Sequence, residues 1–267
     1  MQGESFRKGI TKMNEAMKLV EKTNCLNKGI QYLKSVDISE WDMHAAGFSV
    51  LKFRKLLPED VLNEWEKLDK HTRTIKEGIL QKSRPDIAEA ILTTLAQARQ
   101  AFVYANNINE DQILAIKKDA LFLINANIKT STFEDTFVFR KKNSYTSYMY
   151  LNNKEFYYDS SSDNLDVKGI SEISRIKCRD GILNDIKSFM KSSEKVNPNM
   201  LFNKLKIYRK KYLNRELPID CYREIDNDGM FRLGNYTLMN ASEDILPDLD
   251  ISQNYISYIL PIFGIML

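Results

Sequence analysis

Apolar residues recur every three or four positions over much of the first half of the chain, which predicts helices. Residues 4–24 have this spacing with many charges and are expected to form a surface helix. Residues 58–106 have it over a longer stretch, with a break at residues 83–85. The second part of this stretch should bury one face, made of Ile87, Ile91, Leu95, Ala98 and Phe102.

Shorter apolar runs predict strands on either side of this helical region. The run GIQYLKSVDIS has partly alternating apolar residues and indicates a strand that ends near Asp37. The run ILAIKKDALFLI, residues 113–124, predicts a hairpin with Asp119 in its charged tip. Further strands are expected in TFVFRK, YTSYMYL and KEFYYD, a hairpin loop at residues 159–164, and mostly helix after Gly181. The pattern therefore predicts an α+β fold.

Composition narrows the class of protein without revealing its function. The chain has 267 residues and 43% hydrophobic content, enough for one large domain or two modest ones. Its net charge of +3, from 39 basic and 36 acidic side chains, favours no class of partner. The three cysteines are far apart and suggest neither a zinc site nor a disulfide framework. With no signal peptide pattern and no apolar run long enough for a bilayer, we expect a soluble cytoplasmic protein, bacterial or virus-encoded.

Two aspartates suit metal-dependent chemistry. Nucleotidyl transfer uses two divalent ions about 4 Å apart, and such ions prefer oxygen ligands. A strand ending in Asp37 beside a hairpin that carries Asp119 would bring two carboxylates to one edge of an antiparallel sheet. Each aspartate alone also has a structural explanation, because aspartates in turns bond to nearby backbone amides. Asp119 is the less easily explained of the two, since a charge in an apolar hairpin is unfavourable unless the tip is exposed or the charge has a function.

The segment around Asp37 resembles a motif of right-hand DNA polymerases. Asp37, Ser39 and Asp42 in DISEWDMHAAGF occupy the places of the aspartate, serine and acidic residue in the first palm motif of family A. The resemblance implies that Asp37 binds both catalytic metal ions, Mg²⁺ or Mn²⁺. It also implies that Asp42 selects the sugar by excluding the ribose 2′-hydroxyl.

The hairpin ILAIKKDALFLI is similar to the third palm motif, which implies that Asp119 is the second metal ligand. Lys118 and Ala120 differ from the residues usually found beside this aspartate. The resemblance thus implies a palm sheet carrying both catalytic carboxylates.

Later segments resemble palm and thumb elements of family B polymerases. These are the run from Lys141 to Tyr145, the run DVKGISEISR and the final run DISQNYISYILPIF. By this resemblance, the residues that contact the primer-template are Lys141, Lys142, Tyr145, Lys168, Gly169 and Arg175.

The resemblance implies four regions along the chain. Residues 1–57 hold a helix and the first palm motif, and residues 58–107 form a reduced helical fingers-like insertion. The palm sheet is expected at residues 108–182 and a helical thumb-like region at residues 183–267. A proofreading exonuclease domain has no room ahead of Asp37 and is expected to be missing.

The usual fingers motif is absent, so the cations for a triphosphate must lie elsewhere. Arg73 and Lys76 are three residues apart on a predicted helix and could face the same way. The alternative, equally weighted, is that LDKHTRTIKEG is simply a solvated helix face.

Residues 200–215 form a basic stripe that contains no acidic residue. Leu201, Leu205, Tyr208 and Tyr212 recur at helical spacing, so one face can pack while the cations project outward. Such a helix suits the sequence-independent neutralisation of backbone phosphates. The predicted contacts are Lys204, Lys206, Arg209, Lys210 and Lys211.

The leading hypothesis is a template-directed, DNA polymerase-like nucleotidyltransferase. Its expected partners are a primer-template, nucleoside triphosphates and other replication proteins, with no membrane. The composition, rich in lysine, asparagine and isoleucine, suggests a phage or mobile element. Two alternatives stay open: a polymerase-like module that binds nucleic acid or assembles without catalysis, and an α+β interaction protein with chance motif matches.

Overall fold

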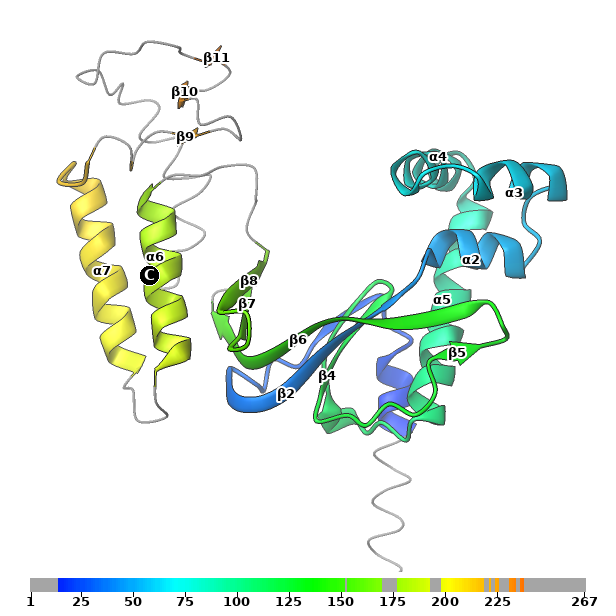
Figure 1. Cartoon of the computed structure of the whole chain (residues 1–267), viewed down its shortest axis with the longest axis horizontal. Coiled ribbons are helices and arrows are strands. Elements are labelled where there is room, and N and C mark those ends of the chain that lie inside the picture. The colour runs from blue at the N-terminus through cyan, green and yellow to red at the C-terminus, as the bar shows by residue number, and fades with distance from the viewer. Residues whose placement is uncertain are drawn as a thin grey trace, which may run out of the picture. The chain divides into compact units, whose positions relative to one another are not determined.

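The computed structural model describes residues 14–151, 153–169, 177–192, 198–218, 221, 224–225, 231–233 and 236–237. Contacts divide the chain into two compact units, Met1–Ile30 with Val36–Tyr145, and Gln31–Ser35 with Thr146–Leu267. Two long strands, β2 (Tyr32–Met43) and β6 (Phe137–Leu151), contribute residues to both units (Figure 1). Each unit combines helices with antiparallel strands, so the predicted α+β class is confirmed.

The first unit is built on an antiparallel sheet. Its strands follow the order β1 (Asn24–Leu26), β3 (Ile113–Lys117), β4 (Ala120–Ile124), β2 and β6, and the short β5 (Thr132–Phe133) pairs with the start of β6. Strands β3 and β4 form the predicted hairpin, with Asp119 in its turn. Strand β4 is buried along its whole length, which explains its continuous apolar sequence.

Four helices of this unit connect β2 to β3. They are α2 (Ala46–Phe53), α3 (Glu59–Glu66), α4 (Lys70–Ser83) and α5 (Pro85–Ala105), and Figure 1 shows the first three gathered at one end of α5. The predicted break is confirmed, since α4 ends at Ser83 and Pro85 opens α5, where its missing N–H leaves no helical bond unmade. Asp69 caps α4 by accepting hydrogen bonds from the backbone N–H groups of His71 and Thr72.

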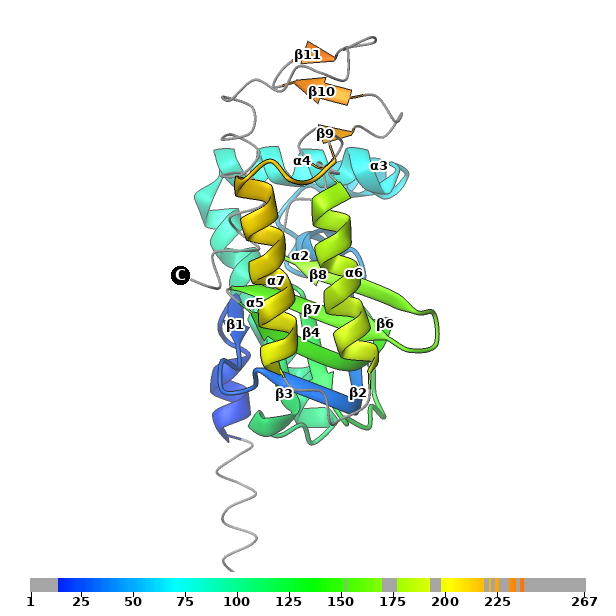
Figure 2. The ribbon, with the colours of Figure 1, turned by 90° about the vertical axis from the view of Figure 1, so that its left-hand side faces the viewer.

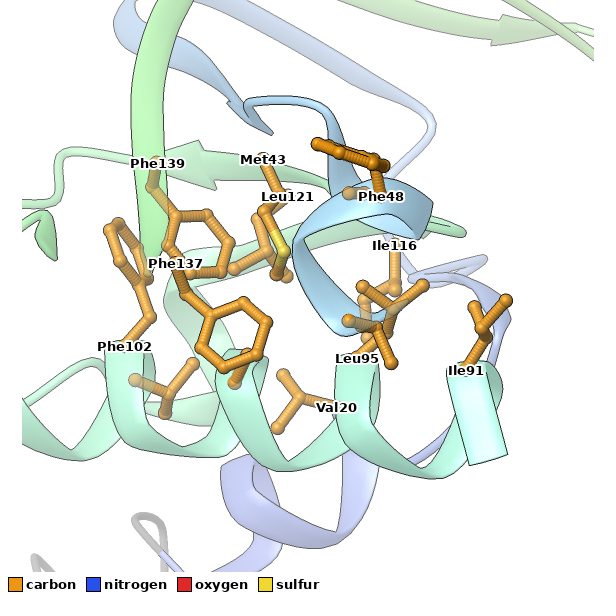
Figure 3. Close-up of a cluster of buried hydrophobic side chains, with 14 of the residues drawn as sticks. Val20, Met43, Phe48, Ile91, Leu95, Phe102, Ile116, Leu121, Phe137 and Phe139 are labelled. Atoms are coloured by element: carbon orange, nitrogen blue, oxygen red, sulfur yellow. The ribbon is translucent and has the colours of Figure 1, made fainter. Parts of the chain in front are cut away.

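The core of the first unit lies between α5, α2 and the sheet (Figure 3). The predicted face of α5 is buried, and Phe102 at its end is fully shielded from solvent. The Phe102 ring lies 4.4 Å from that of Phe139 and 5.7 Å from that of Trp41, measured between centroids. This packing ties α5 to both long strands.

The second unit contains β7 (Lys154–Asp159) and β8 (Asn164–Lys168), which extend the antiparallel pairing from β6. Helices α6 (Lys177–Lys191) and α7 (Pro198–Leu213) lie side by side in both views (Figures 1 and 2). Their facing apolar residues form a second core of Ile182, Ile186, Met190, Leu201 and Leu205.

A small sheet of the second unit was not predicted from the sequence. Strands β9 (Glu224–Ile225), β10 (Phe231–Leu233) and β11 (Tyr236–Thr237) form a small antiparallel sheet. The described residues after Gly181 lie mostly in α6 and α7, as expected, and these short strands were not predicted. Two or three residues per strand are too few for a periodic signal in the sequence.

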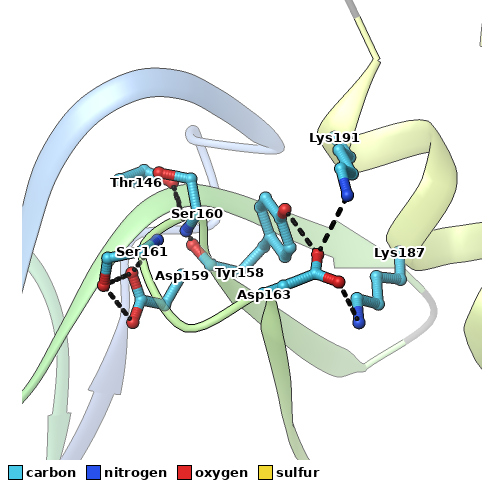
Figure 4. Close-up of polar contacts among 8 residues, drawn as sticks. All are labelled: Thr146, Tyr158, Asp159, Ser160, Ser161, Asp163, Lys187 and Lys191. Atoms are coloured by element: carbon cyan, nitrogen blue, oxygen red, sulfur yellow. Dashed lines mark hydrogen bonds and ion pairs between the residues drawn. The ribbon is translucent and has the colours of Figure 1, made fainter.

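The predicted hairpin loop at residues 159–164 is confirmed between β7 and β8. Asp159 accepts hydrogen bonds from Ser161 and Ser162 within the turn, as Figure 4 shows for Ser161. Asp163 accepts a hydrogen bond from the Tyr158 hydroxyl at 2.9 Å and pairs with Lys187 of α6 at 3.1 Å (Figure 4). Both aspartates therefore have structural roles in fixing this loop.

Two strand boundaries differ from the prediction. Strand β2 continues past Asp37 to Met43, and TFVFRK and YTSYMYL belong to the single strand β6. Polar side chains in the middle of these long strands are hydrogen-bonded to each other, so they do not end the strands. Asn143 and Tyr145 of β6 both donate hydrogen bonds to Glu40 of β2. Among the helices of the described residues, none has the length and apolar character needed to cross a membrane.

Candidate functional site

A cavity of about 260 Å³ opens in the first unit where β2 ends. Three separate segments line it. The end of β2 and the start of α2 supply residues 42–47, the β3–β4 turn supplies Asp119, and α4 supplies Lys70, Arg73, Thr74 and Glu77. The cavity therefore gathers three carboxylates and two cationic side chains.

Asp42 and Asp119 come together because of the pairing between β2 and β4. Asp42 is paired with Ala120, and the backbone N–H of Met43 donates to the carbonyl of Asp119 at 3.3 Å. Burial raises the pKa of the Asp42 carboxyl above its usual value, and the negative charge of Asp119 raises it further. Two carboxylates placed close to each other attract a cation.

The structure does not bring Asp37 and Asp119 together. Asp37 is exposed, and its backbone exchanges hydrogen bonds with Asn125 at the far end of β4. Five residues of extended strand separate Asp37 from Asp42, roughly 17 Å at the usual rise. The expectation of one shared sheet edge for Asp37 and Asp119 is corrected, because β2 does not end at Asp37.

One face of α4 turns its charged side chains toward the cavity. Lys70, Arg73 and Glu77 lie at intervals of three and four residues, which places them on the same side of the helix. Burial raises the pKa of the Glu77 carboxyl, Arg73 opposes this shift and Asp119 adds to it. Lys76 lies on another face, where it pairs with Glu64 at 3.3 Å. Of the two cations expected to face the same way, only Arg73 lines this cavity.

The start of α2 approaches α4 closely at this site. A Cβ atom on Gly47 would collide with the Glu77 carboxylate, so a larger residue at this position would displace the Glu77 side chain. The preceding Ala45 has a φ of 46°, in the left-handed region that a non-glycine residue rarely adopts. Such strain persists only where surrounding contacts enforce it and is concentrated at functional sites.

A buried carboxylate lies two residues before Asp42 on β2. Glu40 is 3% exposed and accepts hydrogen bonds from the Asn143 amide at 2.6 Å and the Tyr145 hydroxyl at 3.0 Å. The Lys142 ammonium lies 3.7 Å from the same carboxylate, and its charge also acts on Asp42. Tyr145, expected to contact nucleic acid, is therefore buried and engaged with Glu40. Lys141 and Lys142 remain exposed.

A second cavity, of about 390 Å³, adjoins the first and shares His44, Ala45 and Arg73 with it. The Phe48 ring forms part of its wall, and the Arg73 guanidinium lies 5.0 Å from the centre of that ring. The pKa of the His44 imidazole is lowered by its partial burial and then by Arg140, Arg73 and Lys70. Several cationic side chains therefore lie close to His44, whereas carboxylates also line both cavities.

The remaining predicted contacts belong to the second unit. Lys168 pairs with Asp166 at 2.9 Å, and Gly169 has a φ of 89°, which favours glycine. Arg175 and the final run DISQNYISYILPIF lie outside the described residues. On α7 the predicted apolar face is buried, and the exposed cations include Lys204, Lys206, Lys210 and Lys211.

The sequence reasoning missed Glu40, Lys70 and Glu77. Lys70 lies three residues before Arg73, and Glu77 lies four residues after it. These intervals place all three side chains on one face of a helix, so helical spacing from Arg73 could have identified the other two. Glu40 and Asp42 alternate with the strand period, a signal that was obscured by ending β2 at Asp37. No sequence pattern indicated that Glu40 would be buried.

The carboxylates of the cavity do not form a complete protein-only metal centre. Among the described residues, no three histidine, cysteine or acidic side chains lie close enough to hold one ion. Two carboxylates nevertheless fit Mg²⁺, which proteins usually hold through one or two carboxylates together with substrate phosphates. Asp42 and Asp119 are the residues that fit this description.

Comparison with protein families finds a match over residues 13–267 to the family described as Bacteriophage PBS1 gene 130 protein. The chain belongs to this family. The description agrees with the expectation of a phage origin and gives no activity. A comparison with curated proteins finds no match.

Asp42→Asn is expected to stabilise the folded chain in the absence of metal. The pKa of Asp42 is higher in the folded chain than in the unfolded chain. At a pH above the pKa in the folded chain, ionisation of Asp42 therefore opposes folding. At a pH below the pKa in the unfolded chain, the carboxyl is protonated in both states and the effect disappears. Thermal unfolding in EDTA should therefore show a higher Tm for the variant at pH 8, with a difference that shrinks toward pH 4. A gain of about 1 kcal/mol corresponds to roughly 2–4 °C.

Asp37→Asn is the control, because it removes the same charge from an exposed position on the same strand. Its Tm should match that of the wild type at both pH values. An Asp42→Asn Tm at or below the wild-type value at pH 8 contradicts the electrostatic description of the pair.

Proposed function

We propose that the first unit catalyses metal-dependent nucleotidyl transfer and extends the end of a nucleic acid, as a polymerase palm does. The observation that carries the proposal is the joining of Asp42 and Asp119 with two cations of α4 in one cavity. This assignment replaces Asp37 with Asp42 as the partner of Asp119. It also replaces the sugar-selecting role of Asp42 with a role in binding metal.

The chemistry of the cavity suits a nucleoside triphosphate that arrives with its divalent ion. A bound Mg²⁺ would supply charge neutralisation for the phosphates and activation of the attacking hydroxyl. Asp42 and Asp119 would hold it as oxygen donors. Either a proton or a divalent cation would relieve the unfavourable burial of negative charge that raises the pKa of Asp42, so a metal would compete with a proton at this carboxylate.

The cations of α4 suit the binding of phosphate oxygens. Arg73 offers a planar set of N–H donors that can bind two phosphate oxygens at once, and Lys70 offers a point charge one turn earlier. Glu77 lies beside Arg73 and restrains its position through charge attraction. The part of α4 that points into the cavity therefore has the role expected of a fingers helix.

Helix α7 of the second unit is also proposed to bind nucleic acid. The exposed Lys206 and Lys210 are four residues apart on α7, so they lie on the same side of the helix. Lys142 of β6 supplies a further exposed cation near Asp42, and Lys141 is also exposed. Contacts of this kind bind backbone phosphates and carry no sequence preference.

Primer extension tests the reaction. With Mg²⁺ or Mn²⁺ and all four deoxy- or ribonucleotides, the wild type should lengthen a primer, and both Asp42→Ala and Asp119→Ala should lose at least about a hundredfold in rate, since each removes a metal ligand. Asp37→Ala is the matched control and should retain the wild-type rate. Equal activity of Asp42→Ala and wild type contradicts the assignment. Duplex binding without synthesis under both metals instead favours the non-catalytic nucleic-acid-binding alternative.

Arg73→Ala should raise the KM for nucleoside triphosphate by about tenfold or more, because charge-assisted hydrogen bonds to phosphate are lost. Steady-state kinetics at fixed primer measure this effect. Lys76→Ala is the control, since it removes a cation three residues along the same helix from a face directed at Glu64. A change of similar size in both variants indicates general electrostatic attraction and contradicts a specific role for Arg73.

The double variant Lys206→Ala with Lys210→Ala should weaken duplex binding and lower the slope of log K against log salt by about two, because two phosphate contacts are lost. Fluorescence anisotropy over a salt series measures both quantities. The control is Lys18→Ala with Lys82→Ala, which removes the same charge from exposed positions in the first unit. An unchanged slope for the α7 variant contradicts this contact.

A further inference from the structure

Arg99 is a buried cation in the middle of the first unit. It lies on α5, is 2% exposed, and belongs to the largest fully buried side chains of the described residues. Arginine is rarely buried so completely, because removing a guanidinium from water is strongly unfavourable unless its donors are satisfied. An apolar side chain is the usual choice at such a buried position, so the presence of an arginine requires an explanation.

The Arg99 guanidinium donates hydrogen bonds to backbone carbonyls of two separate segments. Its Nε donates to Val20 at 2.9 Å and one terminal nitrogen donates to Lys22 at 3.2 Å, both before β1. The other terminal nitrogen donates to the carbonyl of Lys118 in the β3–β4 turn. One side chain thus joins α5, the N-terminal segment and the turn that carries Asp119.

The turn held by Arg99 has an unfavourable backbone conformation. Lys118 has a φ of 54°, in the left-handed region, although it is not a glycine. Its N–H donates to the carbonyl of Thr23 at 2.7 Å, and its own carbonyl accepts from Arg99. The two bonds fix both sides of this residue, immediately before Asp119. A strained conformation of this kind persists only when neighbouring contacts impose it.

The charge of Arg99 also acts on the site. Burial lowers the pKa of the guanidinium, and the attraction to Asp119 opposes that shift, so the buried cation lies near the carboxylate. The backbone bonds satisfy the donors of Arg99 without neutralising its charge.

From this geometry we infer that Arg99 is a positioning residue that fixes the Asp119 turn and so determines the affinity of the carboxylate pair for a divalent cation. The part of the inference that concerns metal affinity rests on the proposed function. The part that concerns the conformation of the turn rests on the hydrogen bonds alone. Arg99 does not touch the substrate in this scheme. It acts through its hydrogen bond to the Lys118 carbonyl, immediately before Asp119.

Arg99→Lys in the full chain tests the inference. Lysine keeps the charge but cannot reproduce the planar set of donors that reaches three carbonyls. Two quantities are measured: binding of Mn²⁺ alone, followed by electron paramagnetic resonance of the free ion, and amide hydrogen exchange. We expect Mn²⁺ binding to weaken by about tenfold or more, as for other residues that orient metal ligands. Exchange should accelerate by a similar factor at the amides of Lys118 and Met43, which donate to Thr23 and Asp119.

Asn106→Ala is the matched control. Asn106 is also buried on the α5 side of the core, and its amide bonds Phe102, Lys129 and Thr130 at 2.7–2.9 Å, away from the Asp119 turn. It should lower the Tm while leaving Mn²⁺ binding and the exchange of Lys118 unchanged. Equal weakening of Mn²⁺ binding in both variants overturns the inference, because loss of stability alone then explains the effect.

The remaining outcomes separate this inference from the proposed function. Wild-type Mn²⁺ binding and turn exchange retained in folded Arg99→Lys overturn the inference and leave the proposed function standing. If Asp119→Asn binds Mn²⁺ as the wild type does, the proposed metal site is wrong. The comparison of amide hydrogen exchange needs no metal, so it still decides whether Arg99 fixes the turn. If Arg99→Lys does not fold, Arg99→Gln takes its place, since it removes the buried charge and retains a hydrogen-bond donor.

Discussion

The antiparallel pairing of β2 with β4 determines which acidic side chains can act together. In this register Ile38 lies opposite Ile124 and Asp42 opposite Ala120, so the end of β2 meets the β3–β4 turn. A slip of one residue would turn the buried Ile38 to the other face of the sheet, and the apolar length of β4 prevents this. The same register that satisfies the core therefore places Asp42 beside Asp119 and leaves Asp37 at the other end.

Several features around the cavity oppose stability. Ala45 and Lys118 both have positive φ angles, which residues other than glycine rarely adopt, and burial raises the pKa of Asp42 and Glu77. Each is unfavourable, and the two buried carboxylates with raised pKa values lie in one cavity, as is typical of a functional site. The rest of the first unit compensates through the packed face of α5, where Phe102 joins rings from both long strands. The cavity is thus adjacent to the main core of the unit, with which it shares Met43 and Ala46.

The two kinds of contact made by α5 explain how a small unit can hold such a site. Its apolar face supplies the burial that stabilises the sheet, whereas Arg99 connects the helix to backbone carbonyls at the strained turn. The second unit contributes a separate core between α6 and α7, with the cations of α7 on its exposed side. A division between a unit with the carboxylates and a unit with a basic helix agrees with the proposed extension of a nucleic acid.

The sequence by itself determined the elements whose signals are local and periodic. These include the break before Pro85, the buried face of α5, the β3–β4 hairpin and the amphipathic α7. It also marked Asp119, Asp42 and Arg73 as chemically unusual. Only the tertiary structure decided that Asp42 and not Asp37 accompanies Asp119, that Lys76 points away, and that Arg99 is buried. The reason is physical: strand register and helix rotation depend on contacts between residues far apart in sequence, which no local pattern contains.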